Sequence, residues 1–550
     1  MSLRREITRA ISDARDRAIR AGALSIPEGA ELPPVGLEQP ANPEHGDWAT
    51  NAALQLAPVA RAAPLAIAGA ILDHLDRPPA IATVDVAPPG FLNVRLDPSW
   101  IAAQVGPILD AGPRYGRGSV EQPRRINVEF VSANPTGPLT VGNARGAFVG
   151  DVLSRVLEAT GHEVTREYYF NDYNEQIRNL GATLLALRRG EEIPPDGYHG
   201  DYVSDLVAAV PADLWEQANG TDADAVELLG RWASERVRQG IESSLARLGV
   251  RFDVWTSEGA IHDAGWVERA IEQLRAAGYM YEEDGALWFR SSDFGDDKDR
   301  VVIRSNGRPT YFAADIGYVA EKFSRGFDEL IYIWGADHHG TVARNRAAAI
   351  ALGFDADAVR WPLIAWVRFV RDGVEIPMSK RSGEFITLDE LLDEVGADGA
   401  RWFFSSRAYT TGIDFDLELA KRQSNENPVY YVQYAHARAS SILRHASEEG
   451  VTPDAERTGE LLVHPSELGL LRHLLDFPDA LAVAAERRET HEIPRYAYEL
   501  ASAFSQFYRD CKVLGEDAAL SAARLALVDA TRSVLANSLD LLGIGAPDSM

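Results

Sequence analysis

The stretch Ser132-Ala-Asn-Pro-Thr-Gly-Pro-Leu-Thr-Val-Gly-Asn143 directly follows a strand-like run, Ile126 to Phe130. Small residues at the carboxyl end of a strand allow a polyphosphate to approach the backbone closely. A helix is expected from about Gly142 to Thr160, with Gly161 as its C-cap, so that its free N–H groups point toward such an anion. A second strand, Glu163 to Tyr169, follows at once. This pattern predicts the βαβ unit of a doubly wound parallel sheet.

Four later strand-like runs are expected to supply the second half of the sheet: Ala286–Arg290, Val301–Arg304, Leu330–Trp334 and Trp366–Val370. Apolar residues at three- and four-residue spacing predict a helical insertion at about 185–275. After about Asn427 strand patterns vanish, and long amphipathic segments predict a helical bundle. The sequence thus predicts a small α/β domain at 1–115, a Rossmann-type domain at 116–425 and an all-helical domain at 426–550.

Composition narrows the function classes. The net charge of -27 over 550 residues excludes nucleic-acid binding by overall basicity, so such a partner requires local basic patches. Cys511 is the only cysteine, which excludes an internal disulfide and a cysteine-based zinc site. No apolar run of about 18 residues exists, and charges of both signs interrupt any signal-peptide pattern at the N-terminus. We therefore expect a cytoplasmic protein with no membrane partner.

A second stretch, Pro377-Met-Ser-Lys-Arg-Ser-Gly383, contains Lys380, one of only five lysines. An ammonium group that closes over a triphosphate stabilises the charge that develops on the leaving pyrophosphate. Arg381 offers a planar second phosphate contact. For this segment taken alone, a solvent-exposed turn is the alternative interpretation.

Together the two stretches resemble the signatures of class I aminoacyl-tRNA synthetases, His-Ile-Gly-His and Lys-Met-Ser-Lys-Ser, and the residues around them resemble arginyl-tRNA synthetases. Thr140 and Asn143 stand where the family has histidines, and Pro377 replaces the leading lysine. Further blocks that resemble the family include Arg145-Gly-Ala147, Arg166–Asp172, Phe385–Leu391, Asp398-Gly-Ala-Arg-Trp-Phe-Phe404 and Asn427–Arg438. The resemblance implies a class I synthetase fold with an N-terminal module that contacts the outer corner of the tRNA and a C-terminal anticodon-binding domain.

The resemblance also implies an activity: ATP-dependent formation of arginyl-adenylate and transfer of arginine to the 3′ end of its tRNA. Magnesium enters with ATP, no protein-bound zinc is expected, and we expect a monomer. By this resemblance, Lys380, Thr140 and Asn143 are catalytic. The ATP contacts are Pro135, Gly137, Thr140, Gly142, Asn143, Gly335, Asp337, His338, Met378, Ser379 and Lys380. Two alternatives stay open: a degenerate paralogue that binds tRNA or arginine without charging, and another nucleotidyl-transferring enzyme on the same fold.

Recognition of arginine asks for carboxylates, because a guanidinium needs planar acceptors and keeps its charge. Tyr311 and Asp315 share one helical face at i and i+4. The family resemblance implies that they bind the guanidinium, and the predicted arginine site comprises Glu129, Ser132, Asn134, Tyr311, Asp315 and His338. Without that context, a packed tyrosine and a surface carboxylate are the alternative.

The segment Asp337-His338-His339 follows a strand and ends at the same sheet edge. It fits contact with nucleotide or arginine, structural hydrogen bonding, or a metal. Adjacent histidines on an extended loop point in different directions, and no third ligand follows within the segment, so we predict no metal site. For the tRNA, aromatic and arginine side chains of the helical domain are predicted to stack on bases and contact phosphates: Tyr430, Tyr434, Arg438, Arg495 and Tyr498.

Overall fold

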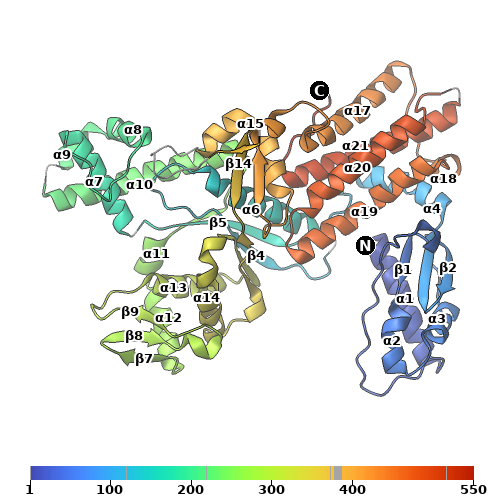
Figure 1. Ribbon diagram of the computed structural model, residues 1–550, viewed down its shortest axis with the longest axis horizontal. Helices are drawn as coiled ribbons and strands as arrows, with labels where there is room; N and C mark the ends of the chain where they lie inside the picture. The colour runs from blue at the N-terminus through green and yellow to red at the C-terminus, as the bar shows by residue number, and fades with distance from the viewer. Residues whose placement is uncertain are drawn as a thin grey trace.

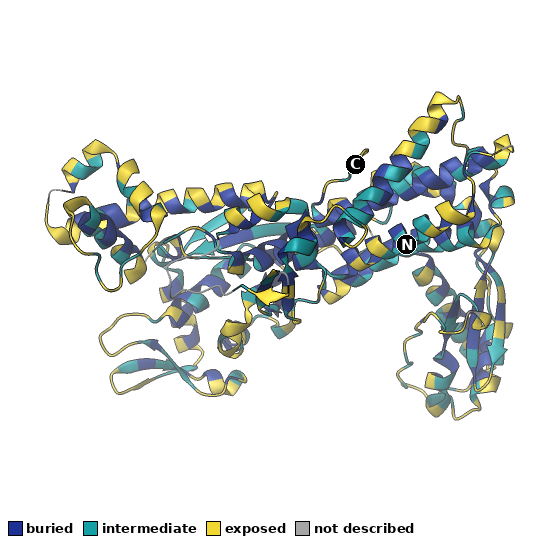
Figure 2. Ribbon diagram, turned by 45° about the horizontal axis from the view of Figure 1, so that its top comes forward, coloured by how far each residue is buried: buried dark blue, intermediate teal, exposed yellow. Residues whose placement is uncertain are grey.

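A computed structural model describes residues 2–118, 120–172, 174–218, 220–371, 373–376, 387–515 and 517–550. The molecule is elongated, with a parallel sheet and its covering helices at the centre (Figure 1). Long C-terminal helices extend to one side with the N-terminal domain beneath them, and a helical insertion lies at the opposite end. Figure 2 shows that buried residues run continuously from the central sheet into the C-terminal helices. A parallel sheet with a helical insertion, a small N-terminal α/β domain and a C-terminal helical bundle agrees with the architecture predicted from the sequence.

The central sheet is parallel and has the strand order β12-β10-β4-β5-β6. Its strands are β4 (Arg125–Glu129), β5 (Glu163–Phe170), β6 (Val254–Ser257), β10 (Glu329–Tyr332) and β12 (Val359–Arg360). Helix α6 (Val141–Thr160) connects β4 to β5 and ends at Gly161, whose φ is 110°. A Cβ atom on Gly150 would overlap the ring of Phe130, so glycine lets α6 pack directly against the sheet. The predicted βαβ unit is confirmed.

From the sequence, four later strand runs are expected to complete this sheet. Three of the four do not join it, so the expectation is wrong for them. β7 (Met280–Glu283), β8 (Ala286–Phe289) and β9 (Arg300–Ile303) form a separate antiparallel sheet. The β7–β8 turn places Asp284 and Gly285 at φ angles of 52° and 75°, which are typical of a two-residue hairpin turn. The backbone hydrogen bonds of β8 are therefore made within a local hairpin, and β8 does not join the parallel sheet.

The run at Trp366–Val370 is β14 (Val367–Arg371), which pairs with β15 (Val374–Glu375) and β16 (Ile413–Asp416). The short strands β11 (Trp334–Gly335) and β13 (Leu363–Ile364) pair with each other in a separate two-stranded sheet. The helices of this region are α11 (Glu258–Asp263), α12 (Trp266–Ala276), α13 (Tyr311–Ser324), α14 (His339–Ala351), α15 (Leu388–Ser405) and α16 (Leu417–Lys421).

The insertion consists of α7 (Glu175–Arg189), α8 (Asp201–Ala209), α9 (Ala212–Gln217) and α10 (Asp222–Arg247). It has its own apolar core around Leu180, Leu184 and Leu229. The range expected from sequence, about 185–275, starts inside α7 and also includes β6, which pairs with β5 in the parallel sheet.

The N-terminal domain contains α1 (Leu3–Arg20), α2 (Ala52–Ala60), α3 (Pro64–Asp73) and an antiparallel sheet ordered β1-β3-β2. Its strands are β1 (Trp48–Thr50), β2 (Ile81–Ala87) and β3 (Phe91–Leu96), and α4 (Pro98–Ala103) and α5 (Val105–Ala111) follow. The C-terminal bundle is α17 (Pro428–Glu448), α18 (Thr458–Leu461), α19 (Pro465–Arg487), α20 (Glu492–Asp510) and α21 (Ala518–Leu542). Among the described residues no single helix is long and apolar enough to cross a membrane, and α2 with α3 meets that test only as a pair bent by 111°.

Candidate active site

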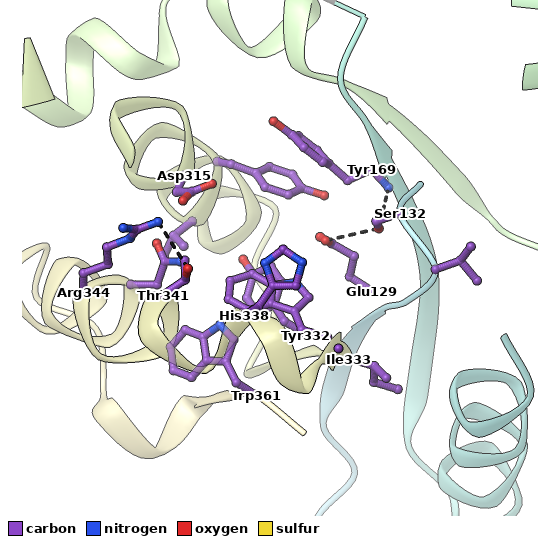
Figure 3. A pocket seen from close by; sticks show the side chains of 16 residues that line it. Glu129, Ser132, Tyr169, Asp315, Tyr332, Ile333, His338, Thr341, Arg344 and Trp361 are labelled. Carbon is purple, nitrogen blue, oxygen red and sulfur yellow. Dashed lines mark hydrogen bonds between the residues drawn. The ribbon is translucent and has the colours of Figure 1, made fainter. Parts of the chain in front are cut away.

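The chain leaves β4 through a strained turn at the rim of the parallel sheet. Val131 and Ser132 have φ angles of 68° and 45°, in a region that residues other than glycine seldom adopt. Ser132 Oγ donates a hydrogen bond to Glu129 Oε1 at 3.3 Å and accepts one from the Tyr169 backbone N–H at 3.2 Å. These bonds hold the turn, so the Ser132 hydroxyl and the Glu129 carboxylate stay side by side (Figure 3).

A cavity of about 260 Å³ opens at this rim, between the ends of β4, β5 and β10 and the helices α13 and α14 (Figure 3). Its volume suits a small metabolite. Five aromatic rings form much of its wall: Tyr169, Tyr318, Tyr332, Trp334 and Trp361. Its polar side chains are Glu129, Ser132, Asp315, His338, Thr341, Arg344 and Asn345.

Glu129 is one of two carboxylates in the cavity, and it has a cationic partner. Lys322 Nζ donates to Glu129 Oε2 at 2.6 Å, and both side chains are almost fully buried. The same ammonium lies 4.5 Å from the ring centroid of Tyr318 and 4.2 Å from that of Tyr332. Lys322 therefore holds the Glu129 carboxylate in place, while its other oxygen remains turned toward Ser132.

Asp315, the second carboxylate, lies on α13 and has an unusual acidity. Burial raises its pKa to about 7, and the negative charges of Glu258 and Glu129 act in the same direction. Arg344 and a hydrogen bond from Asn345 oppose the shift in pKa. A cationic ligand in the cavity would favour the ionised form, because opposite charge at close range lowers the pKa of a carboxyl group. The cavity therefore suits a small organic cation.

The structure brings together four of the six residues predicted for arginine: Glu129, Ser132, Asp315 and His338 all line the cavity. Asn134 and Tyr311 do not line it. The Asn134 amide donates to Gln176 Oε1 at 2.7 Å. Tyr311 begins α13 and is 63% exposed.

Several cavity residues escaped the sequence analysis. Tyr318 follows Asp315 by three positions on α13, so helical spacing alone could have placed it on the same face. Arg344 and Asn345 lie on α14, and Trp361 follows β12. Their segments meet α13 only in the folded chain, and no local pattern links them to Asp315.

The predicted phosphate side of the site begins at Thr140, which precedes α6. Asn143 Oδ1 accepts hydrogen bonds from the Thr140 backbone N–H and the Thr140 hydroxyl, each at 3.1 Å. The two residues that replace the family histidines therefore bind each other across the first turn of the helix. The preceding loop, which contains Pro135 and Gly137, contacts the insertion, since the Tyr202 hydroxyl donates to the Thr136 carbonyl at 2.9 Å.

Gly335 and His338, predicted as ATP contacts, line the cavity. The side chain of His338 is 58% exposed and that of Asp337 is 81% exposed, and they lie 3.7 Å apart. Pro377, Met378, Ser379, Lys380 and Arg381 lie outside the described residues. The chain resumes at Thr387, which forms a β-bridge with Thr140, and the Leu388 N–H donates to the Leu139 carbonyl at 2.9 Å. Thr387, four residues after the second stretch, therefore lies beside Thr140 of the first.

Family models match this chain along most of its length. They are the arginyl-tRNA synthetase N-terminal domain at residues 1–96, the catalytic domain of class I (R) tRNA synthetases at 104–192 and 224–402, and the DALR anticodon-binding domain at 432–550. The arginine–tRNA ligase of Moorella thermoacetica is 47% identical over 100% of this chain and 99% of its own length. The chain belongs to the arginyl-tRNA synthetase family.

Other members of the arginyl-tRNA synthetase family agree. The arginine–tRNA ligase of Carboxydothermus hydrogenoformans is 45% identical over 98% of this chain and 97% of its own length. The arginyl-tRNA synthetase of Thermus thermophilus superimposes with a TM-score of 0.80 at 25% identity, covering all of both chains. The family assignment made from the sequence is confirmed, and family membership implies the use of ATP.

The residues predicted to contact tRNA lie on α17 and α20 of this synthetase. The rings of Tyr430 and Tyr434 stack with centroids 6.1 Å apart. The Arg438 guanidinium lies 4.6 Å from the ring centroid of Tyr434 and donates to its hydroxyl at 3.0 Å. Tyr498 is 43% exposed, whereas Arg495 is paired with acidic neighbours on its own helix, Glu492 and Glu499.

Proposed function

We propose that this chain is an arginine–tRNA ligase, which joins L-arginine to the 3′ end of its tRNA at the expense of ATP. The observation that carries the proposal is the cavity with two carboxylates, Glu129 and Asp315, at the sheet rim where the chain leaves β4 and leads into α6. A cation site and a phosphate site at one sheet rim suit the activation of a cationic amino acid.

In the proposed arginine complex, the carboxylate of Asp315 takes the guanidinium end, with Tyr311 of the same helix beside it. Ionised Asp315 accepts two parallel N–H bonds in the planar geometry that guanidinium groups favour. Ser132, its hydrogen-bond partner Glu129, and Asn134 hold the α-amino and α-carboxylate end, and His338 contributes from the cavity wall. The support is the position of Glu129, Ser132, Asp315 and His338 around one cavity.

For activation, an arginine carboxylate oxygen attacks the α-phosphorus of ATP, and the bond to the pyrophosphate breaks. Pro135, Gly137, Gly142 and Gly335 offer close backbone approach, and Thr140 and Asn143 offer donors to the phosphates and ribose. Magnesium enters with ATP and neutralises phosphate charge. Lys380, with Met378 and Ser379, closes over the leaving pyrophosphate, and Asp337 and His338 contact the nucleotide. We propose no protein-bound zinc.

For transfer, a hydroxyl of the terminal adenosine attacks the arginyl carbonyl carbon, and AMP leaves. We propose that residues 1–115 contact the outer corner of the tRNA, that 116–425 carry the catalysis and that 426–550 bind the anticodon. Tyr430, Tyr434, Arg438, Arg495 and Tyr498 would contact its bases and phosphates. The enzyme acts as a monomer in the cytoplasm, where translation consumes its product.

Aminoacylation of total tRNA with each of the twenty amino acids tests the reaction and its specificity together. We expect charging with arginine alone, and arginine-dependent ATP–pyrophosphate exchange when tRNA is present. Charging with another amino acid, or binding of tRNA without any exchange, would refute the proposal.

A further inference from the structure

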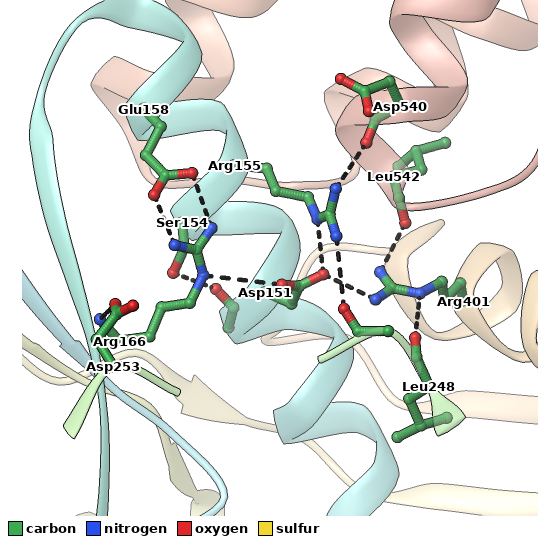
Figure 4. Close-up of polar contacts among 12 residues, drawn as sticks. Asp151, Ser154, Arg155, Glu158, Arg166, Leu248, Asp253, Arg401, Asp540 and Leu542 are labelled. Atoms are coloured by element: carbon green, nitrogen blue, oxygen red, sulfur yellow. Dashed lines mark hydrogen bonds and ion pairs between the residues drawn. The ribbon is translucent and has the colours of Figure 1, made fainter. Parts of the chain in front are cut away.

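The side chain of Arg401, on α15, does not line the cavity and is 1% exposed. It makes three hydrogen bonds to three separate parts of the chain (Figure 4). Nε donates to the Leu248 carbonyl at 2.9 Å, Nη1 to the Leu542 carbonyl at 2.8 Å and Nη2 to Asp151 Oδ2 at 2.8 Å. One side chain thus joins the insertion, the end of the C-terminal bundle and α6.

Two of these three acceptors are carbonyl groups at the ends of helices. Leu248 is the C-cap of α10, and Leu542 is the last residue of α21. The last carbonyls of a helix have no partner within the helix and carry partial negative charge. Asp151 adds a full negative charge. Arginine suits this position because its rigid planar fork donates in several directions at once, which a lysine ammonium does not.

The two turns that contact the Arg401 guanidinium each contain a glycine next to it. Gly249 and Gly543 follow the two acceptor carbonyls and have φ angles of 70° and 66°. A Cβ atom on Gly543 would overlap Arg401 Nη1, and one on Gly249 would lie 3.5 Å from Nη2. Both positions therefore favour glycine because of their positive φ angles. At position 543 a larger residue would also collide with the Arg401 guanidinium.

Asp398, three residues earlier, holds the same end of the bundle. Its carboxylate accepts from the Gly545 N–H at 3.3 Å and from the Gln433 amide at 2.8 Å. The Gln433 amide also donates to the Gly545 carbonyl at 2.9 Å. The two charged residues of Asp398-Gly-Ala-Arg401 thus hold residues 542–545, at the C-terminal end of α21, and we call this set of contacts the clamp.

The helices that meet at this clamp also meet at the active site. Thr140 is the N-cap of α6, and Asp151 lies eleven residues further along the helix, about 16 Å at the rise of an α-helix. α15 follows Thr387, the bridge partner of Thr140, and is kinked at Gly396 before it reaches Arg401. A shift of α21 would therefore act on both helices whose first turns frame the predicted phosphate site.

We propose that Arg401 and Asp398 are positioning residues for amino-acid activation: they dock the end of α21 so that α6 presents Thr140 and Asn143 in the reactive geometry. Neither residue contacts substrate. The inference rests on the proposed function. It predicts a loss in the rate of the chemical step, because misplacement by about 1 Å costs about 100-fold in rate, with little loss of arginine binding.

The test is arginine- and tRNA-dependent ATP–pyrophosphate exchange by the full chain, with kcat and KM measured at a temperature where circular dichroism shows each variant folded. We expect Arg401→Gln to lower kcat by about 10- to 100-fold and to change KM for arginine less than about twofold. Arg401→Lys, which keeps the charge but loses the fork, should recover part of kcat. Asp398→Asn, which keeps one acceptor oxygen, should lower kcat less than Arg401→Gln.

The matched control is Arg300→Gln. Arg300 bonds both oxygens of Asp296, at 2.8 and 2.9 Å, on a loop and strand of the antiparallel sheet, and so joins no two domains. The control should keep wild-type kcat. Folded Arg401 variants with wild-type kcat, or with losses equal to the control's, would overturn the inference. If Arg401→Gln does not fold, Arg401→Lys and Asp398→Asn decide by the same criterion. A wild-type chain without exchange refutes the proposed function itself.

Discussion

Replacing Asp315 with asparagine removes one negative charge from the cavity and keeps the shape of the side chain. Burial raises the pKa of Asp315 to about 7, and a bound guanidinium would favour the ionised form of this carboxyl group. We therefore expect Asp315→Asn to weaken arginine use selectively, with little effect on KM for ATP.

The size of this effect follows from the interaction that the arginine guanidinium loses with the Asp315 carboxylate. A hydrogen bond to a charged group contributes about 1.5–3 kcal/mol, and truncation of one partner of a buried charged pair costs about 2–5 kcal/mol. The overlap of about 2–3 kcal/mol corresponds to a fall in kcat/KM for arginine of about 30- to 160-fold. Arg344 lines the same cavity, and without the Asp315 charge its guanidinium repels the substrate, so the upper part of this range is expected.

The pH dependence of kcat/KM for arginine tests the role of Asp315 more specifically than a measurement at one pH. Below pH 7 the wild-type carboxyl group becomes protonated, so kcat/KM for arginine should fall about tenfold per pH unit. The Asp315→Asn profile should be flat over the same interval. The difference between the two proteins is then largest near pH 8 and disappears near pH 5.

Glu321→Gln is the matched control, because Glu321 lies on the same helix, pairs with Arg325 at 3.1 Å and does not line the cavity. It should keep the wild-type kcat/KM at every pH. An unchanged kcat/KM for Asp315→Asn at pH 8, or a flat wild-type profile between pH 5 and 8, would refute the role given to Asp315.

Three further outcomes are expected. Lys380→Ala should lower kcat of pyrophosphate exchange by about 100- to 1000-fold with KM for arginine nearly unchanged; a matching rise in KM would contradict a role on the leaving group. Tyr498→Ala should raise KM for tRNA by about 5- to 160-fold, since a stacked base contributes about 1–3 kcal/mol; an unchanged KM in charging assays would remove Tyr498 from the tRNA site. Burial and Asp479 raise the pKa of Asp476 to about 7, so its contribution to stability is lost as pH rises through 7. Asp476→Asn should therefore raise Tm relative to wild type at pH 8 more than at pH 5, and an equal difference at both pH values would contradict this.

Local patterns predicted the part of the site that one short segment builds. The expected helix from Gly142 to Thr160 is α6, and the expected strand from Glu163 is β5. Helix caps and strand alternation depend on residues within a few positions, so sequence alone reveals them. The same alternation does not name a strand's partner, which is why the run at Ala286–Arg290 was placed in the wrong sheet.

By itself, the sequence determined the family and the βαβ unit, and it predicted a carboxylate on α13 for a cationic substrate. Only the tertiary structure decided that Tyr332, Arg344 and Trp361 complete the cavity around Asp315, and that Arg401 bonds to groups 141 to 250 positions away in the chain. The physical reason is range: hydrogen bonding and hydrophobic periodicity along one element leave a pattern in neighbouring residues, whereas contacts between distant segments depend on how whole elements pack.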